Sequence, residues 1–309
     1  MGTTYHAAVQ LLLEQPAVTQ WPLLQRTLKM ADGKPPVAWD FPIAGCLAAG
    51  SQESAAIPAV AAITCAHIAI ILIDDILDED PRGEYHQLGA GRTANLATGL
   101  TSLGQQVLDR YPCAHPTLSA TLYARLMGST AYGQDLDVQN THTEEGYWLV
   151  AKAKSSPYFS TALSLGGLYG GADAKLTAAL GEFGALFGEV MQIHDDLNDC
   201  LAEPANVDWL QGRAPLPLLF AELAPHPQQQ RFMELRSQVE DPAALREAQQ
   251  ILVRSGAISY CVNELITRQH KLEALIATLP LANPTPLHQI LAHAIAPVEH
   301  LFASVGAAS

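Results

Sequence analysis

The chain has 309 residues, of which 49% are hydrophobic and only 16% charged, and its formal net charge is −14. This much apolar material can bury a large core, which excludes a disordered chain. The 17 Lys and Arg residues form no basic cluster able to displace counterions from phosphates, which excludes a nucleic-acid binder. An acidic protein that binds an anionic substrate needs metal ions between the two.

Apolar residues at three- and four-residue spacing predict helices along almost the whole chain, and alternating β-branched runs are nearly absent. The predicted helices cover residues 5–14, 20–30, 41–78, 93–111, 117–139, 144–169, 174–199, 215–223, 241–254, 257–278 and 286–303. The span 41–78 is expected to form two helices with a break near Pro58. No low-complexity linker divides the chain, so we expect one all-α domain over residues 1–309.

The five cysteines are odd in number, widely spaced and without a CxxC pair, so neither a zinc site nor a disulfide framework is expected. Reduced thiols and the lack of a signal-peptide pattern favour a cytoplasmic protein. The apolar stretch Ile57–Ile73 is marginal in length for a membrane span and runs directly into five acidic residues. We therefore expect no membrane span and interpret this stretch as a central helix of a bundle.

Two acidic segments, 121 residues apart, each close a long apolar helix with the pattern DDxxD. The first contains Asp74, Asp75 and Asp78, and the second contains Asp195, Asp196 and Asp199. Residues four apart lie on the same helix face, so the outer aspartates of each segment should point the same way. Solvated helix ends are the alternative, but the helix macrodipole disfavours acidic residues at a C-terminus. The pair of segments therefore predicts one shared site between two helices.

Carboxylate oxygens suit Mg²⁺, which keeps several waters and shares its coordination shell with substrate phosphates. We therefore expect a diphosphate to complete the sites, and the metals to act as Lewis acids on the C–O bond that breaks. His67 lies two turns before Asp74 and Gln192 lies three residues before Asp195, so both are candidates to line the same space. The alternative for His67 is a packed core histidine. Gly181, Gly184 and Gly188 fit either close helix packing or cavity lining.

Together these residues resemble the trans-prenyl diphosphate synthase family, the polyprenyl synthetases, over about residues 30–222. The two aspartate-rich segments match the two aspartate-rich motifs of that family. Gly133-Gln134 with Asp137 resembles its GQxxD segment, and Lys154-Ser155 resembles its KT motif, whose lysine contacts the allylic diphosphate.

The resemblance continues beyond the second motif. The stretch from Asp208 to Pro217 resembles the loop that follows this motif, with Arg213 in place of the usual lysine. His67 falls where the family places a residue that contacts isopentenyl diphosphate. The resemblance implies an orthogonal helical bundle around a deep central cavity, a prenyl diphosphate substrate, three Mg²⁺ ions and a homodimer.

The site residues expected from the chemistry and the resemblance fall into three groups. The catalytic candidates are Asp74, Asp78, Asp195 and Lys154. The candidates for diphosphate binding are Lys34, His67, Arg82, Lys154, Gln192 and Arg213. The candidate metal ligands are Asp74, Asp75, Asp78, Asp195, Asp196 and Asp199.

Several positions depart from the family pattern. The GKxRP motif reads Gly33-Lys34-Pro35-Pro36, and the paired arginines after the first aspartate motif read Pro81-Arg82. Proline cannot replace the bidentate fork of arginine, so the site for isopentenyl diphosphate is predicted to be weakened. Ala69 and Ile70 stand where short-chain members of the family carry bulky aromatic residues. They imply either a deep pocket for a C20-sized tail or ordinary core packing.

Three hypotheses follow. The lost arginines favour a terpene synthase, which would release diphosphate from one C20-like substrate and let the cation cyclise, lose a proton or capture water. The second hypothesis is a prenyltransferase that condenses isopentenyl diphosphate with an allylic diphosphate to a farnesyl- or geranylgeranyl-type product. The third, a non-catalytic subunit, is weaker because all six aspartates are present.

Overall fold

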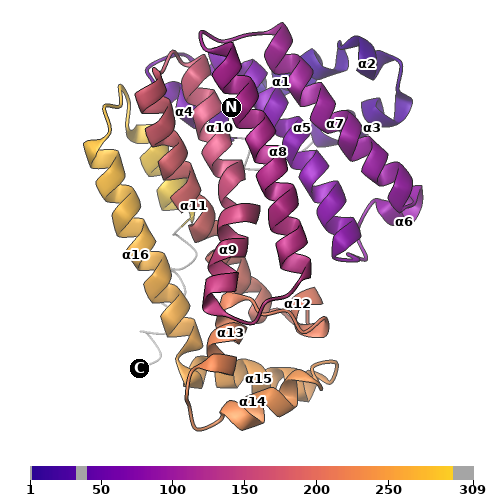
Figure 1. The fold of residues 1–309 in the computed structure, drawn as a ribbon, viewed down its shortest axis with the longest axis vertical. Coiled ribbons are helices and arrows are strands. Elements are labelled where there is room, and N and C mark those ends of the chain that lie inside the picture. The colour runs from indigo at the N-terminus through magenta and orange to yellow at the C-terminus, as the bar shows by residue number, and fades with distance from the viewer. Residues whose placement is uncertain (1, 33–39, 295–309) are drawn as a thin grey trace.

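The computed structural model describes residues 2–32 and 40–294. These residues form helices and contain no strand, which confirms the predicted all-α class (Figure 1). In chain order the elements are α1 (Gly2–Leu13), α2 (Pro16–Thr19), α3 (Pro22–Asp32), α4 (Asp40–Ala48), the 3-10 helix η2 (Glu53–Ala56), α5 (Ile57–Leu77), α6 (Tyr85–Leu88), α7 (Ala90–Arg110), α8 (Pro116–Val138), α9 (Glu144–Lys154), α10 (Ser156–Tyr169), α11 (Ala174–Cys200), α12 (Val207–Leu210), α13 (Leu216–Leu223), α14 (Gln229–Arg236), α15 (Pro242–Ser255) and α16 (Ala257–Thr278). Residues 285–294 are helical as well.

The predicted and observed helices differ at a few boundaries. The expected break near Pro58 is present, because α5 begins at Ile57 with proline in its first turn. The single helix expected over 144–169 is two helices, since Pro157 lies in the first turn of α10 and cannot continue the hydrogen-bond ladder of α9. Helix α14 was not predicted, because it buries only Phe232 and Leu235 and has a weak apolar pattern. The predicted helix over 286–303 extends beyond the described residues.

The long helices lie side by side along the long axis of the molecule, and helices α12–α15 gather at one end (Figure 1). Helix α10 packs against α4 and α11, and α5 packs against α7. One stretch within the described residues, Glu53–Leu77, has the length and hydropathy of a membrane span. In its most apolar window 61% is buried, and α5 contacts α1, α7 and α10, as expected for a core helix.

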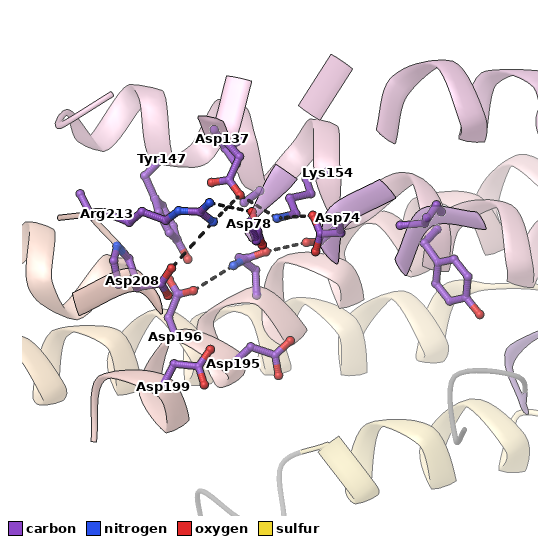
Figure 2. Close-up of a pocket in the computed structure, with 18 of the residues that line it drawn as sticks. Asp74, Asp78, Asp137, Tyr147, Lys154, Asp195, Asp196, Asp199, Asp208 and Arg213 are labelled. Carbon is purple, nitrogen blue, oxygen red and sulfur yellow. Dashed lines mark hydrogen bonds and ion pairs between the residues drawn. The ribbon is translucent and has the colours of Figure 1, made fainter. Parts of the chain in front are cut away.

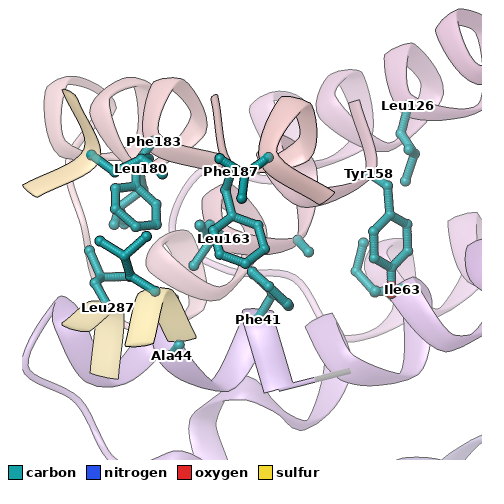
Figure 3. Packing of buried hydrophobic residues seen from close by; sticks show 14 of the residues in the cluster. Phe41, Ala44, Ile63, Leu126, Tyr158, Leu163, Leu180, Phe183, Phe187 and Leu287 are labelled. Carbon is teal, nitrogen blue, oxygen red and sulfur yellow. The ribbon is translucent and has the colours of Figure 1, made fainter. Parts of the chain in front are cut away.

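Aromatic and aliphatic side chains pack together in the main buried cluster, part of which Figure 3 shows. The ring of Phe41 from α4 meets Phe159 of α10 at 4.9 Å and Phe187 of α11 at 5.0 Å, both edge to face. Such contacts contribute about 0.5–1.5 kcal/mol beyond the burial of their area. They fix α10 and α11 relative to α4, and thereby one wall of the cavity described below.

Small residues set the spacing of these helices. A methyl group at Gly166 of α10 would collide with the backbone of Pro42 in α4. Similarly, methyl groups at Gly181, Gly184 and Gly188 of α11 would meet atoms of α10 or of Ser155, which joins α10 to α9. Of the two interpretations left open for these three glycines, the structure supports close helix packing.

We therefore expect the substitution Gly166→Ala to lower the free energy of unfolding by about 1–3 kcal/mol, the cost of overpacking a close contact. The matched control is Gly128→Ala in α8, where the added methyl group meets open space. It should raise the free energy of unfolding by up to about 1 kcal/mol through helix propensity. Urea unfolding followed by circular dichroism measures both. Equal stabilities of the two variants would contradict the α4–α10 contact.

Candidate active site

A cavity of about 430 Å³ lies between α5, α8, α9, α11 and the segment that precedes α13. One wall is formed by a stripe of α5 with His67, Ile71, Asp74 and Asp78, the register predicted from helical spacing. Figure 2 shows the second acidic segment across the cavity, where Asp195, Asp196 and Asp199 of α11 lie. Five of the six predicted aspartates therefore line one space.

The aspartates of α5 are paired with basic groups from distant parts of the chain. The Lys154 ammonium lies 3.0 Å from Asp74 Oδ1 and 2.6 Å from Asp137 Oδ2. The Arg213 guanidinium lies 2.6 Å from Asp78 Oδ1, 3.7 Å from Asp137 and 4.0 Å from Asp208. Two cations are thus placed among four carboxylates, as the dashed lines in Figure 2 show.

The charge states of these cations follow from their surroundings. Burial lowers the pKa of Lys154, but Asp137 and Asp74 outweigh this effect and raise the pKa well above its ordinary value. Burial also opposes the charge of Arg213, and the hydrogen bond to Asp78 raises the pKa of the guanidinium. Both side chains are therefore fully charged at neutral pH.

Gly133 and Gln134 position this cluster from α8. A side chain at Gly133 would collide with the backbone of Lys154, so the glycine lets α8 and α9 approach closely. Gln134 Nε2 donates to the carbonyl of Ile70 at 3.2 Å and to Asp74 Oδ1 at 3.3 Å. The segment that resembles GQxxD thus anchors both the lysine and the first aspartate.

The aspartates of α11 differ from one another in their environment. The Asp195 side chain is 64% exposed and lies at the open cavity. Asp196 is buried, and its carboxylate accepts hydrogen bonds from Gln192 Nε2 and from the backbone N–H of Leu216, both at 2.9 Å. Burial raises the pKa of Asp196 to about 7, although these donors act in the opposite direction.

Of the six aspartates expected to converge on one space, the structure brings five to the cavity and leaves Asp75 outside it. Asp75 does not line the cavity, because it lies one residue beyond Asp74 and hence on another face of α5. Asp196 lines the cavity, but both of its oxygens are already bound to protein donors. Asp74, Asp78, Asp195 and Asp199 remain as cavity-lining carboxylates from two opposite walls.

This donor set fits magnesium that is shared with a substrate. Within the part of the chain that the structure describes, no three Asp, Glu, His or Cys side chains converge closely enough to hold an ion by themselves. Mg²⁺ does not need such a cage, because it retains waters and binds substrate phosphates. Carboxylates on two facing walls leave the space between them for a diphosphate and its ions.

The residues predicted to bind diphosphate have different positions. His67, Lys154, Gln192 and Arg213 line the cavity. Arg82 does not, because its side chain is 88% exposed and pairs with Asp80 at 2.7 Å. Lys34 lies outside the described residues.

Gln192 and His67 are held in the cavity wall by contacts with residues at the start of α10. Gln192 Oε1 accepts from the Ser155 hydroxyl at 2.6 Å, so its amide is held between α11 and the start of α10. The ring of His67 packs 5.2 Å from that of Tyr158, and burial lowers the pKa of His67 to about 4. The imidazole is therefore neutral at pH 7.

Sequence reasoning missed some residues of the site. Asp137 and Asp208 were noted only as parts of matching segments, yet Asp137 pairs with both cations and Asp208 lies 4.0 Å from Arg213. The spacing from Gln134 to Asp137 places both on one face of α8, which is a signal that could have indicated their shared role. Asn140 and Tyr147 also line the cavity, and no pattern in the sequence marks them.

Comparison with known proteins gives a consistent set of relatives. The family model described as Polyprenyl synthetase matches residues 42–252. The octaprenyl diphosphate synthase of Escherichia coli K12 is 26% identical over 266 residues, which cover 79% of either chain. The geranylgeranyl diphosphate synthase of Methanosarcina mazei is 28% identical over 177 residues, which cover 53% of this chain and 54% of that protein.

Solved structures share the fold. A decaprenyl diphosphate synthase from Rhodobacter capsulatus superposes with a TM-score of 0.81 at 19% identity, covering 96% of this chain and 95% of the other. A polyprenyl synthase from Caulobacter crescentus, complexed with calcium and isoprenyl diphosphate, gives a TM-score of 0.80 at 23% identity. The superposition covers 95% of this chain and 94% of that one.

The low pKa of His67 has a consequence for stability. The unfolded chain binds a proton at this histidine below about pH 6.5, whereas the folded protein does so only near pH 4. The contribution of His67 is therefore complete above pH 6.5 and is lost as the pH falls toward 4. When the pH is lowered from 7 to 5, we expect the loss of this contribution to reduce the free energy of unfolding by up to about 2 kcal/mol.

Urea unfolding at several pH values between 5 and 8 tests this expectation. The variant His67→Gln should show a correspondingly weaker pH dependence. His270→Gln, at an exposed position of α16, is the control and should retain the dependence of the wild type. Identical pH dependence in both variants would show that His67 titrates normally.

Proposed function

Because this chain belongs to the polyprenyl synthetase family, we propose that it is a trans-prenyl diphosphate synthase, which condenses isopentenyl diphosphate with an allylic prenyl diphosphate. The observation that carries the proposal is the cavity in which aspartates of α5 and α11 face each other, with Lys154 and Arg213 beside them. A diphosphate is the substrate group that combines with such a mixture of carboxylates and cations, since shared metal ions join it to the carboxylates.

Bound Mg²⁺ would neutralise the diphosphate leaving group and act as a Lewis acid on its oxygens. In our proposal Asp74, Asp78, Asp195 and Asp199 hold the ions, three in number as in the resemblance. Lys154 and Arg213 supply the remaining positive charge from the protein. Both already lie at the aspartates of α5, so a bound diphosphate needs only a local reorientation of their side chains.

In the proposed reaction, the diphosphate group of the allylic substrate is replaced by a carbon atom of isopentenyl diphosphate. The allylic C–O bond breaks and diphosphate leaves with the electron pair; the double bond of isopentenyl diphosphate then attacks the cation, and the adduct loses a proton. The apolar part of the cavity, with Ile70, Tyr158 and Phe159, excludes water from the cation. His67 is neutral, so it can donate a hydrogen bond without adding positive charge near a carbocation.

The terpene synthase hypothesis, favoured from the sequence, finds no support in the comparisons, because the reported relatives are prenyl diphosphate synthases. That hypothesis depended on arginines missing near Arg82 and Lys34. Arg82 does not line the cavity and its side chain pairs with Asp80, but its charge acts on the cavity-lining Asp199, where burial raises the pKa of the carboxyl and Arg82 opposes that rise.

Further features of the proposal concern product size and assembly. Ala69 and Ile70 line a smaller cavity of about 130 Å³ between α5, α7 and α8, where small side chains leave room for a prenyl tail. We propose a product of at least C20. We also propose a single domain over residues 1–309 and a cytoplasmic location, as expected from the sequence, and a homodimer, as the family resemblance implies.

Product analysis tests the activity directly. The purified protein with Mg²⁺ should yield a longer prenyl diphosphate from isopentenyl diphosphate together with a C5, C10, C15 or C20 allylic diphosphate. Little pyrophosphate should be released from an allylic substrate alone. Release from the allylic substrate alone, with no longer diphosphate formed, would instead establish the terpene synthase hypothesis.

The site assignment is tested by Asp195→Ala. Loss of a carboxylate that holds metal and diphosphate should reduce turnover at least about a hundredfold, as for other preorganised electrostatic groups. Folding should be nearly intact, because the Asp195 side chain is largely exposed. Glu182→Ala, at an exposed position on the same helix, is the matched control and should retain wild-type turnover. Full activity of Asp195→Ala would refute the assignment.

A further inference from the structure

Two loops form the rim of the cavity at the end where α12–α15 gather. One joins α8 to α9 over residues 139–143, and the other joins α12 to α13 over residues 211–215 and carries Arg213. They are tied directly to each other, since Asn140 Nδ2 donates to the carbonyl of Gly212 at 3.0 Å. Arg213 therefore reaches the cavity from a loop and not from a helix.

The loop that carries Arg213 is held from behind by Arg236, the last residue of α14. Arg236 Nη2 donates to the backbone carbonyl of Arg213 at 2.6 Å, and Nε lies 2.9 Å from Glu222 Oε1. Its guanidinium also stacks over the buried ring of Trp209, 5.4 Å from the centroid. One planar side chain thus contacts α12, α13 and the loop between them.

Glu222, the carboxylate that pairs with Arg236, also contacts the loop between α8 and α9. Glu222 is buried, with 7% of its side chain exposed, and its second oxygen lies 2.9 Å from His142 Nδ1 in the loop between α8 and α9. Arg236 and Glu222 therefore form a buried ion pair beneath the rim, with one contact to each loop. Neither Arg236 nor Glu222 lines the cavity itself.

We propose that Arg236 is a positioning residue, which fixes the backbone of Arg213 so that the guanidinium of Arg213 stays within reach of Asp78 and of the substrate diphosphate. The part that concerns the diphosphate rests on the proposed function. The role requires arginine, because its rigid fork binds a carboxylate and a carbonyl in different directions at once and its plane stacks on an indole. Lysine would keep the charge and lose this geometry.

Precise placement matters because Arg213 is surrounded by carboxylates at 2.6–4.0 Å. A shift of its backbone by about 1 Å would exchange one carboxylate partner for another and move the guanidinium away from the diphosphate. Displacements of that size can change rates by about a hundredfold. Arg236 does not line the cavity, and the cavity-lining residue that it contacts directly is Arg213, through its backbone carbonyl.

The test compares Arg236→Lys with Arg231→Lys. Arg231 lies on the same helix, is exposed and pairs with Glu247, so it controls for the change of residue type on α14. We expect Arg236→Lys to raise the KM for the allylic diphosphate about tenfold, with a smaller change in kcat, and Arg231→Lys to leave both unchanged. Unaltered KM in Arg236→Lys would overturn the proposal.

A double-mutant cycle separates positioning from a general structural role. In an Arg213→Gln background, Arg236→Lys should add less than about a twofold change, because the group on which it acts is gone. If the double variant instead shows the product of the two single-variant changes in KM, Arg236 acts independently of Arg213, and the proposal is overturned. If Arg236→Lys does not fold, the variant Arg236→Gln with Glu222→Gln removes the link without leaving a buried unpaired charge, and it should show the same pattern.

Amide hydrogen exchange gives a readout that does not need catalysis. Exchange at the amides of residues 211–214 should become at least about tenfold faster in Arg236→Lys and remain unchanged in Arg231→Lys. Equal protection in both variants would overturn the positioning role, whatever reaction the protein catalyses. If instead the wild-type protein elongates no prenyl diphosphate while this exchange pattern is found, the proposed function fails and the placement of the loop by Arg236 stands.

Discussion

The cavity between α5 and α11 carries an excess of negative charge, and the rest of the structure holds these charges together. Besides the buried Asp196, six carboxylates line it, at Asp74, Asp78, Asp137, Asp195, Asp199 and Asp208, whereas the lysines and arginines that line it within the described residues are Lys154 and Arg213. Carboxylates gathered in one partly buried site repel one another. The long helices hold them there because aromatic packing and glycine contacts leave α10 and α11 no freedom to separate. The excess negative charge is what makes the site suitable for divalent ions and unsuitable for a bare diphosphate.

Much of this arrangement follows from helical geometry and could be predicted. The stripe from His67 to Asp78 has the spacing of one helix face, and the structure places these residues on one wall. The all-α class and most helices were predicted for the same reason. Asp75 and Asp196 differ in how far their environments could be predicted. The position of Asp75 on another face of α5 was implied by the spacing, whereas the burial of Asp196 depends on Leu216, which is twenty residues away along the chain.

The remaining features arise from tertiary contacts that local patterns do not encode. Lys154 meets Asp74 across 80 residues of sequence, and the resemblance to a known motif identified the lysine without its partners. Helix α14 has too few buried residues to show an apolar period, so neither the helix nor the role proposed for Arg236 could be inferred from the sequence. The preference for a terpene synthase came from a few substituted positions. Similarity along most of the chain supports the prenyltransferase hypothesis instead, and it reflects the whole cavity and not one loop.

Gly133 shows how an uncharged residue controls the electrostatics of the site. It contributes no atom to the ion-pair network, yet the absence of its side chain allows the backbone of α9 to lie against α8. The length of a lysine side chain is fixed, so the distance between these two helices decides whether Lys154 can reach Asp137 and Asp74 together. The charge balance of the cavity is therefore determined when the helices pack, before any ligand arrives. Because glycine carries only a hydrogen atom where other residues carry a side chain, Gly133 allows the helix spacing on which the attraction of the site for cations depends.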